Sequence, residues 1–540
     1  MKDISSTGSF IDFTLENFIY VDKTEYIPKL VKLKRVFISR PRRFGKSLTL
    51  DTIATLFETG VEPYFKGTWI YDKWTEPTYP VLRLNFLDLD KYSLEHFKQK
   101  LNAIISSFAR DINVKNYEEK VEPEDTIYFL LDELRKEKRQ IVILIDEYDC
   151  QMTANINNET LYKQFQEKIK SFYANIKDKF AIKFLGITGV TRLKDVAIFS
   201  VGSDINDITN DSAYSQMIGF TRDEIKKYYI DYLKLAASYE NNCTVDNVTE
   251  AQIESLLDRL AKNYDGYCFD EFYKKKVFST WSVNKFFQSV VSNKFVYFGE
   301  YWYDNGGLPS ILVNYLKTHE LNIFEYLDKD KFLKVSSDDF KNPTALTTIN
   351  QNVLMCQTGY LTLRSDLNKT STVALGIPNG EIYKALNRLL ANNIFKGNTD
   401  ITDDYGRSLL EVGTVDDIIN LFNSALNSVS YDNYPIVSES SVQNMLKLYL
   451  LGAHQKVLSE VHEAKGRADL VVNTDNRRIV FEFKYAKNET EAKSKLLDAV
   501  EQIKTRDYGN IVPKKTELLR IATVFNADPK VRAFTEFQLV

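Results

Sequence analysis

Short apolar runs of strand length alternate with helix-spaced apolar positions over the first 220 residues of the chain. The strand-like runs lie at 36–38, 81–86, 141–145 and 184–188. Continuous apolar runs of this kind are typical of strands buried on both faces of a parallel sheet. After residue 47 the apolar positions recur every three or four residues, as in an amphipathic helix. This alternation predicts a parallel α/β domain over residues 1–220.

Helical patterns dominate from residue 221 onward. The helix-spaced stretches are 225–236, 251–264, 281–291 and 310–316. Residues 221–425 are therefore predicted to be mostly helical, with a strand-like stretch at 359–364. The Gly-Ile-Pro-Asn-Gly stretch at 376–380 has the composition of a linker.

The last part of the chain, residues 426–540, reads as a helix, three strands, a helix and a strand. The first helix is expected at 441–451 and the last strand at 518–524. The predicted fold class is thus an α/β multidomain protein with three parts. A parallel α/β domain comes first, then a largely helical middle region, then a small C-terminal α/β domain.

A glycine-lysine-serine loop follows the first strand-like run. The sequence Ser-Arg-Pro-Arg-Arg-Phe-Gly-Lys-Ser at 39–47 lies between a strand and a helix, which is the context that a phosphate-binding loop requires. In such a loop Lys46 reaches the β and γ phosphates and the Ser47 hydroxyl holds Mg²⁺. Arg40 occupies the place of the usual first glycine. The residues assigned to nucleotide binding here are Arg42, Arg43, Phe44, Gly45, Lys46, Ser47 and Leu48.

Two further strand ends carry matching polar residues. The run 141–145 ends in Asp146 and Glu147, which predicts a Mg²⁺ neighbour and a residue that polarises the attacking water. A helix cap would explain Asp146 alone. Thr188, at the end of the next strand, is a candidate sensor of the γ-phosphate. Arg192 is either an arginine finger or a surface arginine, and the surface position is favoured.

A second candidate site lies near the C-terminus, on two strand-like runs at 468–473 and 478–484. A tight turn at 474–477 would pair Asp469 with Glu482, because both are equidistant from its centre. Lys484 shares that face by the period of two. Two carboxylates and an amine at one point can hold a divalent metal and activate a water. The alternative is a hairpin with a cross-strand salt bridge.

A long amphipathic helix follows this hairpin, capped by Asn488 and carrying Gln502 and Tyr508. Strand-Asp, strand-Glu-x-Lys and a helix with Gln and Tyr resemble the PD-(D/E)XK nuclease superfamily. The resemblance implies that Asp469 and Glu482 bind the metal with the Phe483 carbonyl, and that Lys484 orients or activates water. It further implies that Gln502 and Tyr508 contact the metal-bound water or the substrate backbone. Glu439, at the start of the helix before the hairpin, is a candidate for an extra acid.

The chain as a whole is similar to a bacterial family of AAA-ATPase-like proteins with a PD-(D/E)XK nuclease-like domain at the C-terminus. The motifs that carry the resemblance are those at 40–47, 145–149 and 188–190, together with 20–24, 264–267, 281–283 and 357–361. Arginine at the first loop position is usual in that family. The stretch 5–16 and the residues after 198–200 depart from its pattern. The resemblance implies a P-loop domain of the ASCE/AAA type, with ATP and Mg²⁺ as cofactors and Mn²⁺ as an alternative at the nuclease site.

Composition narrows the class of protein only slightly. The chain has 540 residues and a formal net charge of −4, so its bulk charge carries no signature of nucleic-acid binding. Four cysteines and four histidines show no zinc spacing. Strand-sized apolar runs and a polar start predict a cytoplasmic protein that does not contact a membrane.

Two classes of function fit these observations. The first is an enzyme with two active sites, an ATPase coupled to a metal-dependent nuclease that acts on nucleic acid, with DNA favoured over RNA. The second is a nucleotide-dependent binding or signalling switch, of the mobile-element or phage-defence type, whose nuclease domain is inactive or conditionally active. Both are compatible with a homo-oligomer.

Overall fold

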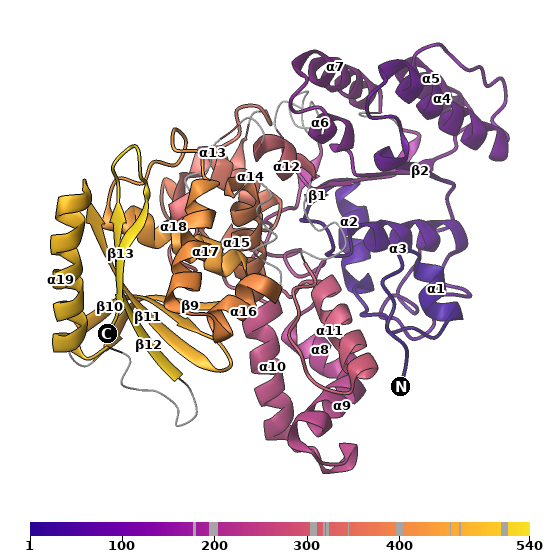
Figure 1. Ribbon diagram of the computed structural model, residues 1–540. Helices are drawn as coiled ribbons and strands as arrows, with labels where there is room; N and C mark the ends of the chain where they lie inside the picture. Colours follow the sequence, from indigo (N-terminus) through magenta and orange to yellow (C-terminus); the bar gives the residue numbers. More distant parts are fainter. Residues whose placement is uncertain are drawn as a thin grey trace. The chain divides into compact units, whose positions relative to one another are not determined.

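The computed structural model describes residues 1–176, 180–193, 204–302, 310–316, 319, 323–343, 345–395, 404–453, 455–463, 466–508 and 517–540 (Figure 1). These residues form two compact units. The first contains Met1–His319 and Phe332–Ile382, and the second contains Glu320–Lys331 and Tyr383–Val540. No helix among the described residues is long and apolar enough to cross a membrane.

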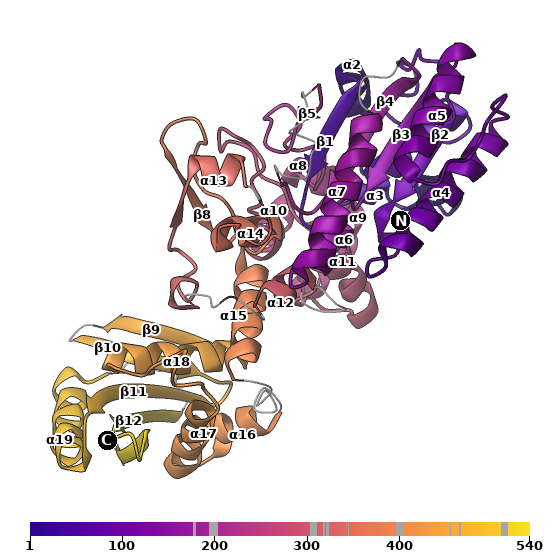
Figure 2. The ribbon, with the colours of Figure 1, turned by 90° about the horizontal axis from the view of Figure 1, so that it is seen from above.

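A parallel five-stranded sheet forms the centre of the first unit, in the order β2-β3-β4-β1-β5 (Figure 2). The strands are β1 (Arg35–Ser39), β2 (Val81–Asn85), β3 (Ile141–Asp146), β4 (Ile182–Gly189) and β5 (Asn206–Asp207). Four of them match the predicted strand-like runs to within a few residues. Since β4 lies between β1 and β3 and all run parallel, their carboxyl ends meet at one edge of the sheet.

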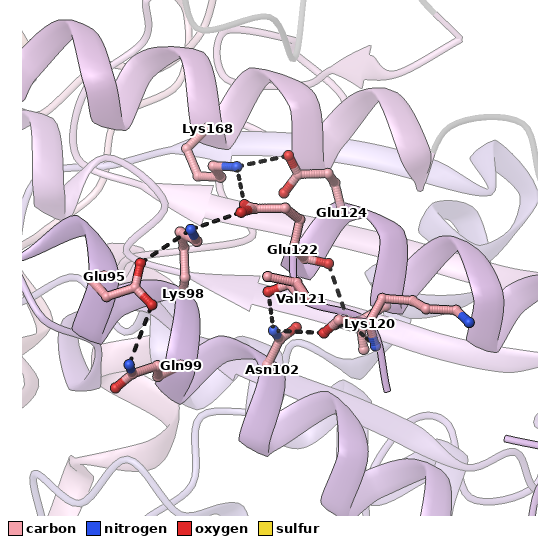
Figure 3. A network of polar contacts seen from close by, with 10 residues as sticks. Glu95, Lys98, Gln99, Asn102, Lys120, Val121, Glu122, Glu124 and Lys168 are labelled. Carbon is pink, nitrogen blue, oxygen red and sulfur yellow. Dashed lines mark hydrogen bonds and ion pairs between the residues drawn. The ribbon is translucent and has the colours of Figure 1, made fainter. Parts of the chain in front are cut away.

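Helices precede β1 and connect the strands from β1 to β4. They are α1 (Phe10–Leu15), α2 (Ile27–Leu33), α3 (Lys46–Thr59), α4 (Leu94–Asp111), α5 (Pro123–Lys136), α6 (Cys150–Ala154) and α7 (Glu159–Asn175). A polar network joins α4, the start of α5 and α7 (Figure 3). In it Lys98 pairs with Glu122 at 2.8 Å, and Lys168 pairs with Glu124 at 2.8 Å. Asn102 donates to the Val121 carbonyl at 2.9 Å. These contacts fix the helices that flank β2.

The middle of the chain is largely helical, as expected. It contains α8 (Arg222–Tyr228), α9 (Ile230–Asn241), α10 (Glu250–Tyr264), α11 (Thr280–Asn293), α12 (Ser310–Leu316), α13 (Ser337–Lys341) and α14 (Gln351–Gln357). The single helix expected at 225–236 is wrong, because the helix breaks at Tyr229. The Tyr229 ring is buried in the helical core, and its hydroxyl donates to the Asn284 side chain. Short 3-10 helices occur at Thr24–Tyr26, Phe86–Asp88, Val245–Asn247 and Ile323–Glu325.

The middle region also contains a small sheet of order β6-β8-β7, of which the sequence predicted only one strand, at 359–364. Its strands are β6 (Leu333–Ser336), β7 (Thr362–Leu363) and β8 (Thr372–Gly376). The stretch 376–380 is not a solvated linker. Arg364 donates to the Pro378 carbonyl, and a Cβ on Gly266 would lie 2.3 Å from the same oxygen. This close approach requires glycine at residue 266, whose φ is +97°.

The second unit is built on a sheet of order β13-β12-β11-β10-β9. Its strands are β9 (Lys456–Glu463), β10 (Gly466–Asn473), β11 (Arg477–Ala486), β12 (Glu517–Asn526) and β13 (Ala533–Leu539). Only β11 and β12 pair in parallel. Sequence patterns missed β13, because its alternating, half-exposed residues form no apolar run.

Helices cover both faces of this sheet (Figure 1). The helices that pack on it are α17 (Val415–Asn427), α18 (Glu439–Gly452) and α19 (Glu489–Arg506), and α15 (Gly380–Ile394) and α16 (Asp404–Val412) precede them in the chain. Ala499 and Ile503 of α19 pack with Val480 of the sheet. Phe422 of α17 meets Phe481, which faces the other way along the same strand. The predicted fold class is confirmed in all three parts.

Candidate active sites

The predicted phosphate loop links the carboxyl end of β1 to the first turn of α3. Gly45 caps α3 with a φ of +101°, and Arg43 also has a positive φ of +68°. The Lys46 ammonium is buried and donates to the carbonyls of Arg40 at 3.1 Å and Pro41 at 3.3 Å. The loop is thus folded around its lysine, as a loop that cradles phosphates is.

Polar residues from β3 and β4 meet the start of α3. Asp146 accepts a hydrogen bond from the Ser47 hydroxyl at 2.6 Å and another from the Thr188 hydroxyl. The Glu147 carboxylate lies 3.8 Å from the Lys46 ammonium. Burial raises the pKa of Glu147, an effect that the charge of Lys46 opposes. Five residues that the sequence singled out therefore form one cluster.

Asp149, part of the 145–149 motif but given no role from the sequence, supports this cluster. Its carboxylate accepts hydrogen bonds from the Thr191 amide at 2.7 Å and the Thr191 hydroxyl at 2.6 Å. A Cβ on Gly189 would lie 2.4 Å from the Tyr148 ring, so this ring can pack against the end of β4 only because residue 189 is glycine. The Asp-Glu-Tyr-Asp run at 146–149 is the signal that could have revealed this residue.

The loop residues before Gly45, namely Arg42, Arg43 and Phe44, differ in burial and in the groups they contact. The Arg43 guanidinium donates to the carbonyls of Tyr301 at 2.9 Å and Trp302 at 2.8 Å, and it lies 4.7 Å from the centre of the Trp281 ring. Phe44 is fully buried. Arg42 remains partly exposed. The side chain of Arg43 thus ties the loop to the segment after α11.

Arg40 is buried, whereas Arg192 is partly exposed. Arg40 is buried, with its guanidinium 4.1 Å from the centre of the Phe269 ring, and it donates to the Thr209 carbonyl at 2.6 Å. Arg192 forms an ion pair with Asp207 and keeps only 22% of its side chain exposed. Arg192 is thus partly exposed and paired with Asp207 of β5, and the choice between an arginine finger and a surface arginine stays a prediction.

A cavity of about 160 Å³ adjoins the phosphate loop. Leu48 of α3 lines it beside Trp281 of α11 and the aromatic rings of Tyr20 and Tyr26. Backbone of the loop at Gly45 forms another part of the wall. An apolar, aromatic-lined cavity next to a phosphate site suits the ring system of a nucleotide.

The second candidate site lies at the end of the β10–β11 ladder. The register pairs Leu470 with Phe481, so Asp469 and Glu482 are the next opposed pair. The Phe483 amide donates to the Asp469 carboxylate at 2.9 Å. The predicted turn symmetry is confirmed by this register. The site is therefore held by strand pairing rather than by a loop.

Lys484 completes this group. Its ammonium lies 2.7 Å from the Glu482 carboxylate, 3.2 Å from the Phe483 carbonyl oxygen and 3.6 Å from the carboxylate of Glu439 on α18. Burial raises the pKa of Glu482 to about 7, helped by the nearby charge of Asp469. For Lys484, burial lowers the pKa, but the bond to Glu482 and the surrounding carboxylates outweigh it and raise the pKa overall.

One oxygen of the Glu482 carboxylate has no hydrogen-bond donor within the described part of the chain. The side chain is completely buried, and its Oε2 accepts no hydrogen bond from the residues that the structure describes. A buried carboxylate oxygen without a donor is costly unless a cation meets it. Among the described residues no three His, Cys, Asp or Glu side chains cluster as metal ligands. Asp469, Glu482 and the Phe483 carbonyl form an all-oxygen set that suits Mg²⁺ or Mn²⁺ with several waters retained.

Gln502 of α19 lies beside Tyr508, which follows the helix instead of belonging to it as the sequence predicted. The Gln502 amide donates to the Tyr508 hydroxyl at 3.3 Å, and Arg506 donates to the same oxygen at 3.1 Å. Gln443 of α18 donates to the Asp469 carbonyl. The sequence pointed to Gln502 and Tyr508 but not to Gln443 or Arg506, because neither stands in a recognisable motif.

These two sites define the class of protein. The first unit has the parallel sheet, the phosphate loop and the acidic strand end of a Walker-type ATPase fold, and the second has a mixed sheet with a strand-borne Asp and Glu-x-Lys. Residues 5–199 match the family described as Predicted AAA-ATPase, and residues 437–534 match the PD-(D/E)XK nuclease superfamily. The chain thus carries an N-terminal AAA-ATPase-like domain and, at its C-terminus, a domain that matches the PD-(D/E)XK nuclease superfamily.

One curated relative and two solved structures are similar to the chain. The uncharacterized protein in the vnfD 5' region of Azotobacter chroococcum mcd 1 is 26% identical over 533 residues, covering 95% of this chain and 94% of the relative. A Walker-type ATPase of Pyrococcus abyssi aligns over 67% of this chain and 94% of its own, with 13% identity and a TM-score of 0.35. Cdc6p from Pyrobaculum aerophilum aligns over 68% and 93%, with 12% identity and a TM-score of 0.23.

Proposed function

We propose that this protein binds and hydrolyses ATP in its first unit and cleaves nucleic acid, with DNA as the preferred substrate, in its second. The observation that carries the nuclease half is the buried Glu482 carboxylate with one oxygen lacking a donor, next to Asp469 and Lys484. The match to the nuclease superfamily does not by itself show that this domain cleaves nucleic acid. A buried, unpaired carboxylate oxygen is tolerated where it meets a cation.

In the ATPase half, Lys46 would exchange its contacts with loop carbonyls and Glu147 for the β and γ phosphates. Ser47 and Asp146 would hold Mg²⁺, since their oxygens already lie 2.6 Å apart. Glu147 would polarise the attacking water, and Thr188 would sense the γ-phosphate. The cavity lined by Leu48 and its aromatic neighbours would receive the base.

In the nuclease half, Asp469, Glu482 and the Phe483 carbonyl would hold Mg²⁺, or Mn²⁺ in its place. The bound cation supplies a water of lowered pKa and offsets charge on the phosphate. The Phe483 amide keeps the Asp469 carboxylate in one orientation. Lys484 would orient the water or stabilise the negative charge, and Gln502 would contact the substrate backbone.

The ATPase half is tested with two variants. Lys46→Ala removes the cation best placed for the phosphates, so calorimetry should detect no ATP binding. Glu147→Gln keeps the Mg²⁺ ligand Asp146, so it should bind ATP and hydrolyse at least about a hundredfold more slowly, the scale of a lost general base. Lys100→Ala, at an exposed lysine of α4, is the control and should behave as wild type. Unchanged ATP affinity in the Lys46 variant would contradict the assignment.

The nuclease half is tested by incubating the full chain with plasmid, linear DNA and RNA, with and without ATP and Mg²⁺. Cleavage should require Mg²⁺ or Mn²⁺ and should disappear in Glu482→Gln. The matched control is Glu501→Gln, an exposed glutamate of α19. If wild type hydrolyses ATP but cuts no nucleic acid under any of these conditions, the nuclease proposal is rejected in favour of a nucleotide-dependent switch.

A further inference from the structure

A groove of about 870 Å³ opens at the amino-terminal edge of the first sheet. Its walls include Arg35 at the start of β1 and Ile182 and Lys183 at the start of β4. The phosphate loop follows the other end of β1, so the groove and the ATP site lie at opposite edges of the sheet. The proposed ATPase chemistry therefore does not use this groove.

The groove is strongly basic, although the chain as a whole carries a net charge of −4. One lining residue, Glu76, is acidic. Six of the fourteen lining residues are cations, namely Lys32, Lys34, Arg35, Lys73, Arg135 and Lys183. A local excess of positive charge attracts polyanions even when the protein as a whole is negatively charged.

Part of this charge is neutralised within the first unit. Lys183 pairs with Glu76 at 2.6 Å, Arg35 pairs with Asp204 at 2.6 Å, and Arg135 pairs with Asp132. Lys73 donates to the Trp69 carbonyl and lies 4.5 Å from the centre of its ring. Six cations against three carboxylates leave a net charge of +3.

Two exposed lysines carry most of that excess. Lys32 lies in the last turn of α2, and Lys34 follows directly after the helix. Neither forms an ion pair with any of the residues that the structure describes. Their ammonium groups are free to meet anions that are not part of the first unit.

Two aromatic side chains interrupt the basic lining. Phe180 is 64% exposed, which is unusual for so large an apolar group. Trp74 is partly buried, and its indole N–H finds no acceptor among the described residues. Aromatic rings beside a basic track are the combination that binds single strands, because unpaired bases stack on the rings while phosphates meet the cations.

We propose that this groove binds a single-stranded stretch of nucleic acid, with Lys32 and Lys34 against its phosphates and a base stacked on Phe180. The choice of a single strand follows from the ring, since a base within a duplex has no free face to offer. This proposal rests on nucleic acid being the substrate of the second unit. It assigns the ATPase unit a role in holding that substrate.

The test measures binding of the full chain to a fluorescein-labelled 30-nucleotide DNA by anisotropy, in EDTA so that nothing is cut. The double variant Lys32→Glu, Lys34→Glu should bind about tenfold more weakly or worse and should lower the slope of log affinity against log salt by about 1.4, or 0.7 per lost phosphate contact. Phe180→Ala should weaken binding about fivefold or more. Basal ATP hydrolysis should stay unchanged in these variants.

The charge-matched control is Lys262→Glu, Lys294→Glu, at exposed lysines of the helical region. It should keep wild-type affinity. The proposal is overturned if the groove variant and the control bind equally well, if wild type binds no single strand, or if free pyrophosphate displaces the strand as effectively as an unlabelled oligonucleotide. Because cleavage is not measured, a protein that binds through the groove yet cuts nothing would refute the nuclease proposal and leave this one standing.

Discussion

At the scale of single residues, the environment of Glu482 decides how the second site behaves. The pairing of β10 with β11 brings Glu482 opposite Asp469. Burial in the sheet then makes the Glu482 carboxylate retain a proton close to neutral pH. Burial is the larger cause, and the charge of Asp469 adds to it, so the pKa rises to about 7. A metal that binds this carboxylate must therefore displace a proton at pH values below 7.

We expect the affinity of the second site for Mg²⁺ or Mn²⁺ to depend on pH accordingly. Below pH 7 it should rise about tenfold per pH unit, because one proton is released for each metal bound, and above pH 7 it should level off. Calorimetric titrations between pH 5.5 and 8.5 measure this, with Glu482→Gln as the blank. An affinity independent of pH in that range would mean that Glu482 is not a ligand.

At the scale of elements, the first turn of α15 is fixed to the segment that contacts the phosphate loop. The Glu381 carboxyl accepts hydrogen bonds from the Trp302 amide at 2.8 Å and the Ser282 hydroxyl at 2.7 Å. The Trp302 carbonyl accepts from Arg43 of the loop. Glu381 is buried, and burial raises its pKa to about 8 despite these donors.

This raised pKa makes stability depend on pH in a defined direction. The unfolded chain loses the Glu381 proton near pH 4.3, whereas the folded protein keeps it until about pH 8. The folded state therefore binds more protons in this interval, and the Glu381 contribution to the free energy of unfolding falls as pH rises from about 4.3 to 8. Glu381→Gln stays neutral at every pH and should lose this dependence.

Urea unfolding of wild type and Glu381→Gln at several pH values provides the measurement. The difference between the two curves isolates Glu381 from other titrating groups, provided that the transition of the first unit is followed. The variant should gain stability relative to wild type as pH rises. Parallel pH profiles would show that Glu381 ionises normally in the folded protein.

At the scale of the whole molecule, the two candidate sites lie in separate compact units. Lys46, Asp146 and Glu147 belong to the first unit, and Asp469 and Glu482 belong to the second. Each unit has its own sheet and its own buried core. Substitutions at sites that share no partners usually act independently.

We therefore expect Asp469→Ala to abolish cleavage while ATP hydrolysis without nucleic acid stays within about twofold of wild type. Lys46→Ala should leave metal affinity at the second site unchanged, as measured by calorimetry without nucleotide. A large loss of ATP hydrolysis in the Asp469 variant would show that the two units are coupled even without substrate. Circular dichroism of each variant controls for misfolding.

The sequence by itself determined most elements and most of the chemistry. Continuous apolar runs predicted four strands of the first sheet, because a parallel strand buried on both faces leaves little choice of residue. Lys46, Ser47, Asp146 and Thr188 come together because each stands at a strand end or a helix start, a position that local patterns reveal. The Asp469–Glu482 pairing followed from the symmetry of one short turn.

Only the tertiary structure decided how these groups are surrounded. It turned Arg43 toward the carbonyls of Tyr301 and Trp302, paired Arg192 with Asp207, and buried the stretch 376–380 against Gly266. It also gathered the six cations of the basic groove from segments far apart in the sequence. Burial and charge pairing depend on contacts between distant segments, which no local pattern of hydrophobic and polar residues encodes.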